Sequence, residues 1–207
     1  MKKGFSKIIF ILMAMIIFYA PSVFAVDSFN YSVKSGDSLW KICVKYQIGC
    51  SELLSINPQI SNPDLIYPGQ LIKVPDYSAI KALENEVIRL VNVERSKQGL
   101  APLKANWQLS RVARYKSQDM INKNYFSHTS PTFGSPFKMI KDFGINYRTA
   151  GENIAYGQNS ASSVMNSWMN SSGHRSNILS SKYSQIGVGA AKDKNGTIYW
   201  TQMFIGW

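Results

Sequence analysis

Two histidines and one glutamate are the residues of this sequence that could most directly do chemistry. His128 and His174 are the only histidines among 207 residues, and Glu152 lies between them in the chain. Two imidazoles and a carboxylate suit zinc, which takes three protein ligands and one water at catalytic sites. The three residues lie too far apart to share one helix or turn, so only a tertiary fold could gather them.

The sequence contains no motif typical of nucleophilic catalysis. It contains no Gly-x-Ser-x-Gly turn and no His-Glu-x-x-His helix. Ser135 and Lys138 have the spacing of a Ser-x-x-Lys motif, but the other motifs of that class are missing. Ser135 followed by Pro136 is instead typical of the start of a helix.

The two cysteines, Cys43 and Cys50, are a second chemically distinctive pair. In an oxidising compartment a disulfide between them would tie two short predicted helices together and add about 2 kcal/mol of stability. We favour this bridge, and two buried thiols that pack as small apolar groups are the alternative. The spacing leaves both open, because it does not establish the geometry that a bridge requires.

The first 25 residues have the pattern of a secretion signal. Three lysines precede an apolar run over residues 8–19, and Val23-Phe24-Ala25 supplies a site with small residues, so we predict cleavage after Ala25. An uncleaved N-terminal anchor is the alternative. The run is shorter than the roughly 20 residues that a membrane-spanning helix needs, and no later segment approaches that length. We therefore predict a secreted protein with no stable membrane span.

The chain is strongly basic. Lysine and arginine number 23 against 12 acidic residues, and 20 basic residues, a net charge of +8, would remain after cleavage. Outside a cell this charge favours anionic wall polymers as partners. Nucleic acid is not an expected partner, because the chain carries an export signal. Basic residues such as Arg111, Arg114 and Lys116 are also spread along a predicted helix, as on a solvated face.

We expect two domains, over residues 30–76 and 80–207, joined by a short linker. The first has a simple order of elements, strand, helix, helix, strand. Its patterns predict a strand at 31–33, a helix that Ser38 caps, a second helix at 52–56 and a closing strand at 71–74.

Residues 31–75 resemble a LysM domain over their whole length. The resemblance rests on Tyr31-x-Val33-x-x-Gly36-Asp37-Ser38-Leu39-Trp40-x-Ile42, on Asn57-Pro58 and on Ile66-Tyr67-Pro68-Gly69-Gln70. It implies binding of glycans that contain N-acetylglucosamine, chiefly peptidoglycan or chitin, in a shallow groove between two loops. The residues it assigns to this groove are Gly36, Asp37, Ser38, Leu39, Asn57, Pro58, Ile66 and Tyr67. The alternative is that Gly36, Asp37, Pro68 and Gly69 of the motif serve only turns and helix caps.

The second domain combines helices with a terminal pair of strands. Both histidines fall in segments that we expect to be irregular. Helical spacing predicts helices over 79–99, 107–123 and 160–171 and a short helix between Pro136 and Gly144, while apolar runs at 186–191 and 197–205 predict a β-hairpin. This order predicts an α+β fold.

A second resemblance covers roughly residues 84–207. It rests on Asn92-x-x-Arg95, Tyr125-Phe126-Ser127-His128, Gly151-Glu152-Asn153-Ile154, Trp168-Met169-Asn170-Ser171, Gly173-His174-Arg175-x-Asn177-Ile178 and Tyr199-Trp200-Thr201-Gln202. This set is similar to the bacterial branch of the CAP superfamily, also called SCP-like. The resemblance implies an α-β-α sandwich behind a small βααβ LysM module, as in secreted LysM-CAP proteins of spore-forming bacteria. Many CAP members line a cleft with two histidines and two acidic residues, sometimes around a divalent cation.

The CAP resemblance places His128, Glu152 and His174 in that cleft, with two departures. Ser171 stands where animal members tend to carry a second glutamate, and Tyr199 where they have their second histidine. Loss of one carboxylate weakens a cation site, because the remaining charge must offset desolvation of the metal. We therefore expect hydrogen-bonded cleft residues and no required cofactor, with a divalent cation such as zinc as the alternative.

Three functions remain open. The preferred one is a noncatalytic protein of the cell wall or spore surface that binds peptidoglycan through residues 31–75 and presents its CAP domain to a ligand or partner. The second is a metal-dependent hydrolase of cell-wall amides, which needs the three cleft residues within a few ångströms of one another. The third is a binder of a small apolar ligand, which needs a large apolar groove.

Overall fold

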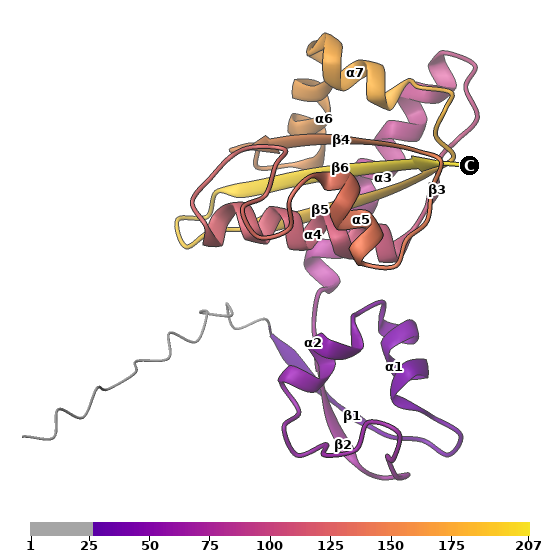
Figure 1. The fold of residues 1–207 in the computed structure, drawn as a ribbon, viewed down its shortest axis with the longest axis vertical. Helices are drawn as coiled ribbons and strands as arrows, with labels where there is room; N and C mark the ends of the chain where they lie inside the picture. Colours follow the sequence, from indigo (N-terminus) through magenta and orange to yellow (C-terminus); the bar gives the residue numbers. More distant parts are fainter. Residues whose placement is uncertain (1–26) are drawn as a thin grey trace, which may run out of the picture.

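A computed structural model describes residues 27–207, which form a small and a large domain in succession along the chain (Figure 1). The predicted secretion signal, residues 1–25, lies outside this range. Within residues 27–207, no helix is both long enough and apolar enough to cross a membrane.

The small domain is a βααβ unit, in the predicted order of elements. It consists of β1 (Ser28–Ser32), α1 (Leu39–Tyr46), α2 (Cys50–Ser55) and β2 (Leu71–Pro75). The strands pair antiparallel, with Tyr31 opposite Ile72. The Ser38 hydroxyl accepts a hydrogen bond from the Lys41 amide, so it caps α1 as the sequence predicts.

The core of the small domain lies between its two helices and its strand pair. The structure joins Cys43 to Cys50, with their Cα atoms 5.6 Å apart. A domain of this size buries little apolar surface, so a covalent link between α1 and α2 adds stability that packing alone supplies poorly. The other buried apolar residues are Tyr31, Val33, Leu39, Ile42, Ile48, Leu53, Ile60, Ile72 and Val74.

The large domain is an α-β-α sandwich, as predicted (Figure 1). Its sheet has the strand order β3-β5-β6-β4, in which only β3 and β5 are parallel. Its elements are α3 (Ser78–Lys97), β3 (Lys104–Ala105), α4 (Trp107–Asn122), α5 (Pro136–Asp142), β4 (Thr149–Tyr156), α6 (Ala161–Asn170), α7 (Ser172–Ile178), β5 (Gln185–Lys192) and β6 (Ile198–Gly206). The last two strands form the predicted hairpin.

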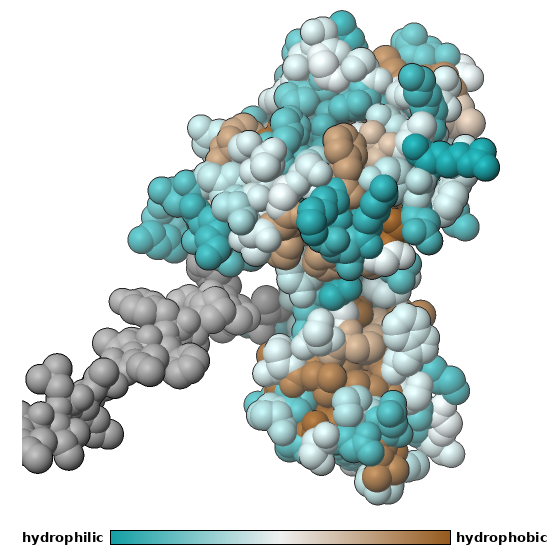
Figure 2. All heavy atoms as spheres, viewed as in Figure 1, coloured by the Kyte–Doolittle hydropathy of each residue, from teal (hydrophilic) through white to brown (hydrophobic). Residues whose placement is uncertain are grey.

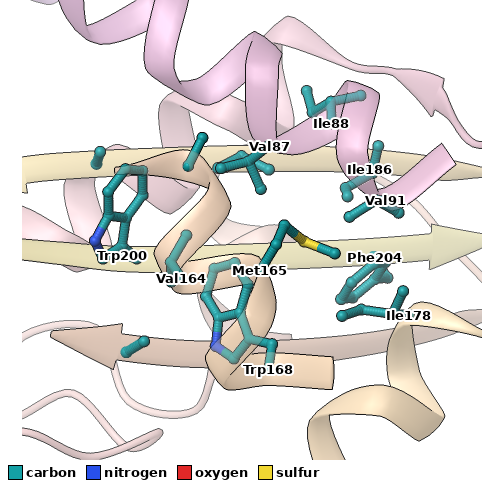
Figure 3. Packing of buried hydrophobic residues seen from close by; sticks show 14 of the residues in the cluster. Val87, Ile88, Val91, Val164, Met165, Trp168, Ile178, Ile186, Trp200 and Phe204 are labelled. Atoms are coloured by element: carbon teal, nitrogen blue, oxygen red, sulfur yellow. The ribbon is translucent and has the colours of Figure 1, made fainter. Parts of the chain in front are cut away.

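Each face of the sheet has its own apolar core. On one face, α3, α6 and α7 cover Trp200 and Phe204 of β6, and Trp168 of α6 packs there (Figure 3). On the other face, Leu109 of α4 packs against Met203 of β6, with α5 at the margin. The alternation of buried side chains along β6 thus sends neighbouring residues into two different cores.

Two glycines allow α4 to lie directly against the sheet. Gly187 and Gly189 of β5 face this helix, and a Cβ atom at either position would overlap the backbone of α4. Because α4 lies so close to β5 and β6, the loop that follows it is held near the same face of the sheet.

The prediction that α4 carries a solvated basic face was wrong. Arg111 forms an ion pair with Glu52 of the small domain at 2.6 Å, and Arg114 forms one with Glu84 of α3 at 2.6 Å. Lys116 is fully buried. The acidic partners lie on other elements, far away in sequence, and the helical period of α4 gives no sign of them.

The sequence analysis also misplaced His174 and missed two strands, the short β3 and the longer β4. His174 lies inside α7, whereas we predicted an irregular segment. The segment that carries Glu152 is the edge strand β4, which the sequence analysis left unassigned. Its run of small and polar residues, Thr149-Ala150-Gly151-Glu152-Asn153, lacks the apolar alternation that identifies a strand, because pairing with β6 and tertiary hydrogen bonds stabilise it instead.

Candidate functional site

His128 and Glu152 form a hydrogen-bonded pair across 24 residues of sequence. His128 lies in the loop between α4 and α5, and Glu152 lies on β4. His128 Nδ1 is 2.7 Å from Glu152 Oε1. The histidine side chain is 55% exposed, whereas that of Glu152 is only 2% exposed. A buried acid is therefore covered by a ring that a ligand can reach.

Lys116 of α4 anchors the loop that carries His128. Its ammonium group donates hydrogen bonds to the carbonyl oxygens of Ser127 and His128, at 2.7 and 2.9 Å, and to the Tyr125 hydroxyl at 3.0 Å. All three donor positions of the lysine are thus used within one loop. The charge of Lys116 also lies near enough to Glu152 to act on its pKa.

Asp119, on the same helix, completes the anchorage. Its carboxylate accepts hydrogen bonds from the hydroxyls of Tyr125, Ser130 and Thr132, at distances of 2.6 to 2.7 Å. Sequence reasoning missed both anchors. A signal was present for Lys116, which continues the inward-facing stripe of α4, where a charged residue needs buried partners.

The pKa values of both members of the pair are raised. Burial raises the pKa of Glu152, although the hydrogen bond from His128 and the charge of Lys116 act to lower it. The hydrogen bond to Glu152 raises the pKa of His128 above its ordinary value, against a smaller effect of desolvation. Among the described residues, Glu152 Oε2 has no hydrogen-bond partner, so half of this carboxyl group is free.

His174 is connected to the pair through the backbone. Its carbonyl oxygen accepts a hydrogen bond from Asn153 Nδ2 at 3.1 Å, and Asn153 also bonds Gln202 and Asn177. Burial lowers the pKa of His174, and the nearby charge of His128 lowers it further. The lowered pKa favours the neutral ring, which lies close to the pair without being bonded to it.

The cleft residues do not fit the zinc alternative in this conformation. Within residues 27–207, no three His, Cys, Asp or Glu side chains are grouped so as to hold an ion. His128 and Glu152 are bonded to each other, and Ser171 and Tyr199 add no acidic or imidazole ligand. We therefore derive no chemistry through a metal.

In the small domain, Asn57 is used by the fold itself. It is fully buried, and its Nδ2 donates to the carbonyl oxygens of Leu53 and Lys73, each at 2.7 Å. Its Oδ1 accepts from the Lys73 amide and from Gln59 Nε2. Both donors are occupied, and Leu39 is buried as well, at 4% exposure. These two side chains shape the predicted groove from within and present no surface to a sugar.

The other predicted groove residues lie at the surface of two loops. Tyr67 is 59% exposed, and Trp40, which the sequence analysis did not assign to the groove, is 61% exposed in the first turn of α1. Figure 2 shows hydrophobic residues on the surface of the small domain, which holds six of the eleven large exposed hydrophobic residues described. The remaining groove residues, exposed or half-buried, are Gly36, Asp37, Ser38, Pro58 and Ile66.

The sandwich and the small module define a two-domain protein of known families. The profile of the cysteine-rich secretory protein family, CAP, matches residues 88–204, and the profile of the LysM domain matches residues 31–75. The chain therefore belongs to the CAP family and carries an N-terminal LysM module.

Individual relatives match one part of the chain or the other. The chain is 57% identical over 129 residues to the uncharacterised protein YkwD of Bacillus subtilis (strain 168), an alignment that covers 62% of this chain and 49% of YkwD. It is 54% identical over 46 residues to the spore coat assembly protein ExsA of Bacillus cereus, covering 22% of this chain and 7% of ExsA.

A solved structure supports the architecture of the large domain. An extracellular protein containing an SCP domain from Bacillus anthracis str. Ames superposes with a TM-score of 0.57 at 34% identity, over 68% of this chain and 47% of that protein. The present chain thus spans about half the length of YkwD and of this structural relative. The predicted fold class is confirmed.

Proposed function

We propose that this is a secreted protein of the cell wall or spore surface that holds peptidoglycan through its LysM groove and presents a noncatalytic CAP domain. The observation that carries the proposal is the exposure of two aromatic side chains on the module, Tyr67 in the segment between α2 and β2, which the buried Asn57 ties to β2, and Trp40 in the first turn of α1. Exposed rings of this kind need no rearrangement before they bind a flat ligand.

The groove has the chemistry that an acetylated sugar requires. Gly36 adopts φ +84° in the exposed turn before α1, a conformation that glycine permits, and its carbonyl oxygen accepts a hydrogen bond from Lys41 Nζ at 2.7 Å. The exposed ring of Tyr67 and the half-buried side chain of Ile66 offer apolar surface to the flat face of a pyranose. A groove this shallow supports modest affinity, and the basic charge of the chain adds attraction to anionic wall polymers.

The LysM module and two relatives support the proposed location at the cell wall or spore surface. ExsA is named for spore coat assembly, and the structural relative from Bacillus anthracis is described as extracellular. A wall or spore-surface location also agrees with the secretion signal predicted in residues 1–25. Peptidoglycan is a more fitting ligand than chitin for a protein of such an envelope.

The noncatalytic role of the CAP domain rests on the state of its cleft. His128 Nδ1 and Glu152 Oε1 are bonded to each other, and the described residues include no group of three side chains that could hold a metal ion. One observation favours the alternative of a wall hydrolase, namely the free Oε2 of Glu152. The two hollows described lie at the domain junction and are lined by charged residues such as Lys81, Glu84 and Arg114, so they do not favour a small apolar ligand there.

The test is a peptidoglycan sedimentation assay with the full chain, combined with measurement of released muropeptides. Tyr67→Ala together with Trp40→Ala should reduce the bound fraction several-fold, whereas Phe137→Ala, at an exposed aromatic residue of the CAP domain, should not. Equal binding by all three proteins would refute the LysM proposal. Muropeptide release that a chelator or His128→Ala abolishes would replace the noncatalytic role with metal-dependent hydrolysis.

A further inference from the structure

Three aromatic side chains form a row on the surface of the CAP domain. The rings of Phe126 and Tyr156 lie with their centroids 4.8 Å apart, and those of Tyr156 and Tyr199 lie 5.5 Å apart and nearly parallel, at 23°. Phe126 is 46% exposed and Tyr156 is 51% exposed. We call these three residues the aromatic row.

The aromatic row shares one face of the sheet with the His128–Glu152 pair. Tyr156 and Tyr199 are directly opposite each other in the β4–β6 ladder. Side chains alternate along a strand, so Tyr156 points to the same face as Glu152, about 13 Å farther along β4. The loop between α4 and α5 runs alongside this part of β4. Its residue Phe126 contacts Tyr156, and its residue His128 bonds Glu152.

The fold leaves the polar groups at both ends of this surface unused. Within the described residues, the hydroxyls of Tyr156 and Tyr199 make no hydrogen bond, in contrast to the Tyr125 hydroxyl, which is held by two charged residues. At the other end, Glu152 Oε2 has no partner although its side chain is only 2% exposed. A buried and unpaired carboxyl oxygen is costly to the fold, and the group of this pair that a ligand can reach is the exposed ring of His128.

We propose that the aromatic row and the His128–Glu152 pair form a second glycan-binding surface, which takes N-acetylglucosamine-containing strands of peptidoglycan. The rings pack against the apolar C–H faces of pyranose units, and the exposed imidazole of His128, which Glu152 orients, bonds a hydroxyl or acetamido group. This combination of extended aromatic surface and a few fixed polar groups matches a saccharide, which presents both kinds of surface along one strand.

The LysM module supplies this ligand, so the inference rests on the proposed function. Once the module holds a strand, the CAP domain meets neighbouring saccharides at a high effective concentration, because only a short segment separates the two domains. A weak second contact then increases retention on the wall without tight binding of its own.

The experiment is a titration of the chain from residue 26 onward with N-acetylchitohexaose, followed by NMR of ¹³C-labelled tyrosine and phenylalanine rings. We expect saturable shifts of Tyr156, Tyr199 and Phe126 in addition to shifts of Tyr67 in the module. A double variant, Phe126→Ala with Tyr156→Ala, should then weaken retention on peptidoglycan by about tenfold. Phe137→Ala is the matched control and should retain normally.

The outcomes separate the two proposals. Shifts of Tyr67 alone would overturn the second surface and leave the LysM proposal intact. Shifts of the aromatic row alone would support the second surface and refute glycan binding by the module. Because the shifts are measured on the unsubstituted chain, the result does not depend on whether the double variant folds. Glu152→Gln provides a further check, since it should weaken the shifts of Tyr156 and Tyr199 while leaving those of Tyr67 unchanged.

Discussion

The ammonium group of Lys116 lies beneath the loop that carries His128 and donates a hydrogen bond to the His128 carbonyl oxygen at 2.9 Å. The position of the exposed imidazole is therefore set by a fully buried cation on α4. This relationship makes α4 the element that defines both the packing of the sheet and the geometry of the cleft.

Replacement of Lys116 should destabilise the loop that carries His128. Lys116→Met removes three hydrogen bonds and leaves the carbonyl oxygens of Ser127 and His128 without their donor. We expect the free energy of unfolding to fall by about 2 to 4 kcal/mol, measured by chemical denaturation. Lys123→Met, at the exposed end of the same helix, is the control and should cause little change. Equal losses in both variants would show that the buried lysine has no anchoring role.

The two histidines should titrate in opposite directions from the ordinary value of 6.5. The pKa of His128 is raised by its hydrogen bond to Glu152, and the pKa of His174 is lowered by burial. Proton NMR of the two imidazoles measures both. Glu152→Gln should lower the pKa of His128 while leaving that of His174 nearly unchanged. An unaltered His128 titration in this variant would mean that the pair does not form in solution.

The raised pKa of His128 also predicts how the stability of the protein depends on pH. Because the pKa of His128 is higher in the folded state than in the unfolded state, its contribution is fully present below about pH 6.5 and is lost as the pH rises through its folded pKa. The raised pKa of Glu152 acts in the same direction. The Glu152→Gln variant should therefore lose less stability than the parent chain between pH 6 and pH 8, roughly the range in which a histidine titrates.

The buried ion pair between α3 and α4 should contribute far more to stability than an exposed ion pair within α3. Glu84 bonds Arg114 at 2.6 and 2.9 Å and also accepts from the Ala190 amide of β5. Glu84→Ala leaves a buried guanidinium unpaired and should cost about 3 to 5 kcal/mol in thermal or chemical unfolding. Glu86→Ala, two residues later and paired at the surface with Arg89, should leave the melting temperature nearly unchanged.

Substitutions of Asn57 and Tyr67 should distinguish a structural role from a binding role in the LysM module. Asn57→Ala removes four hydrogen bonds and should destabilise the module by several kcal/mol, on the order of 1 kcal/mol for each bond lost. Tyr67→Ala should weaken peptidoglycan binding at unchanged melting temperature, because its ring is largely exposed. If Asn57→Ala kept full stability and lost only binding, a direct contact with the glycan would be indicated after all.

Much of the fold could be predicted because its signals are local. The cap at Ser38, the start of α5 at Ser135-Pro136 and the terminal hairpin each depend on residues within a few positions of one another. β4 could not be predicted, because its polar and small residues are held by pairing with β6, whose own residues follow some 50 positions later. His174 was misplaced for a related reason, since α7 is only seven residues long and has a glycine in its first turn.

The candidate site was recognised only in its residue types. The sequence identified His128 and Glu152 as cleft residues through a family resemblance, but it gave no distance between them and did not reveal Lys116 or Asp119 beneath the loop. Conversely, Asn57 stood out as a groove residue, and the structure shows its side chain fully engaged within the module.

The sequence by itself determined the two-module organisation, the family of each module and most of the helices, because these depend on local periodicity and on motifs whose residues are close together. Tertiary structure alone decided which charges are buried, which polar atoms remain free, and that Phe126, Tyr156 and Tyr199 form one surface. The physical reason is that hydrogen bonds, ion pairs and ring contacts act over a few ångströms in space. Such short distances arise here only when the sheet brings together segments that lie tens of residues apart.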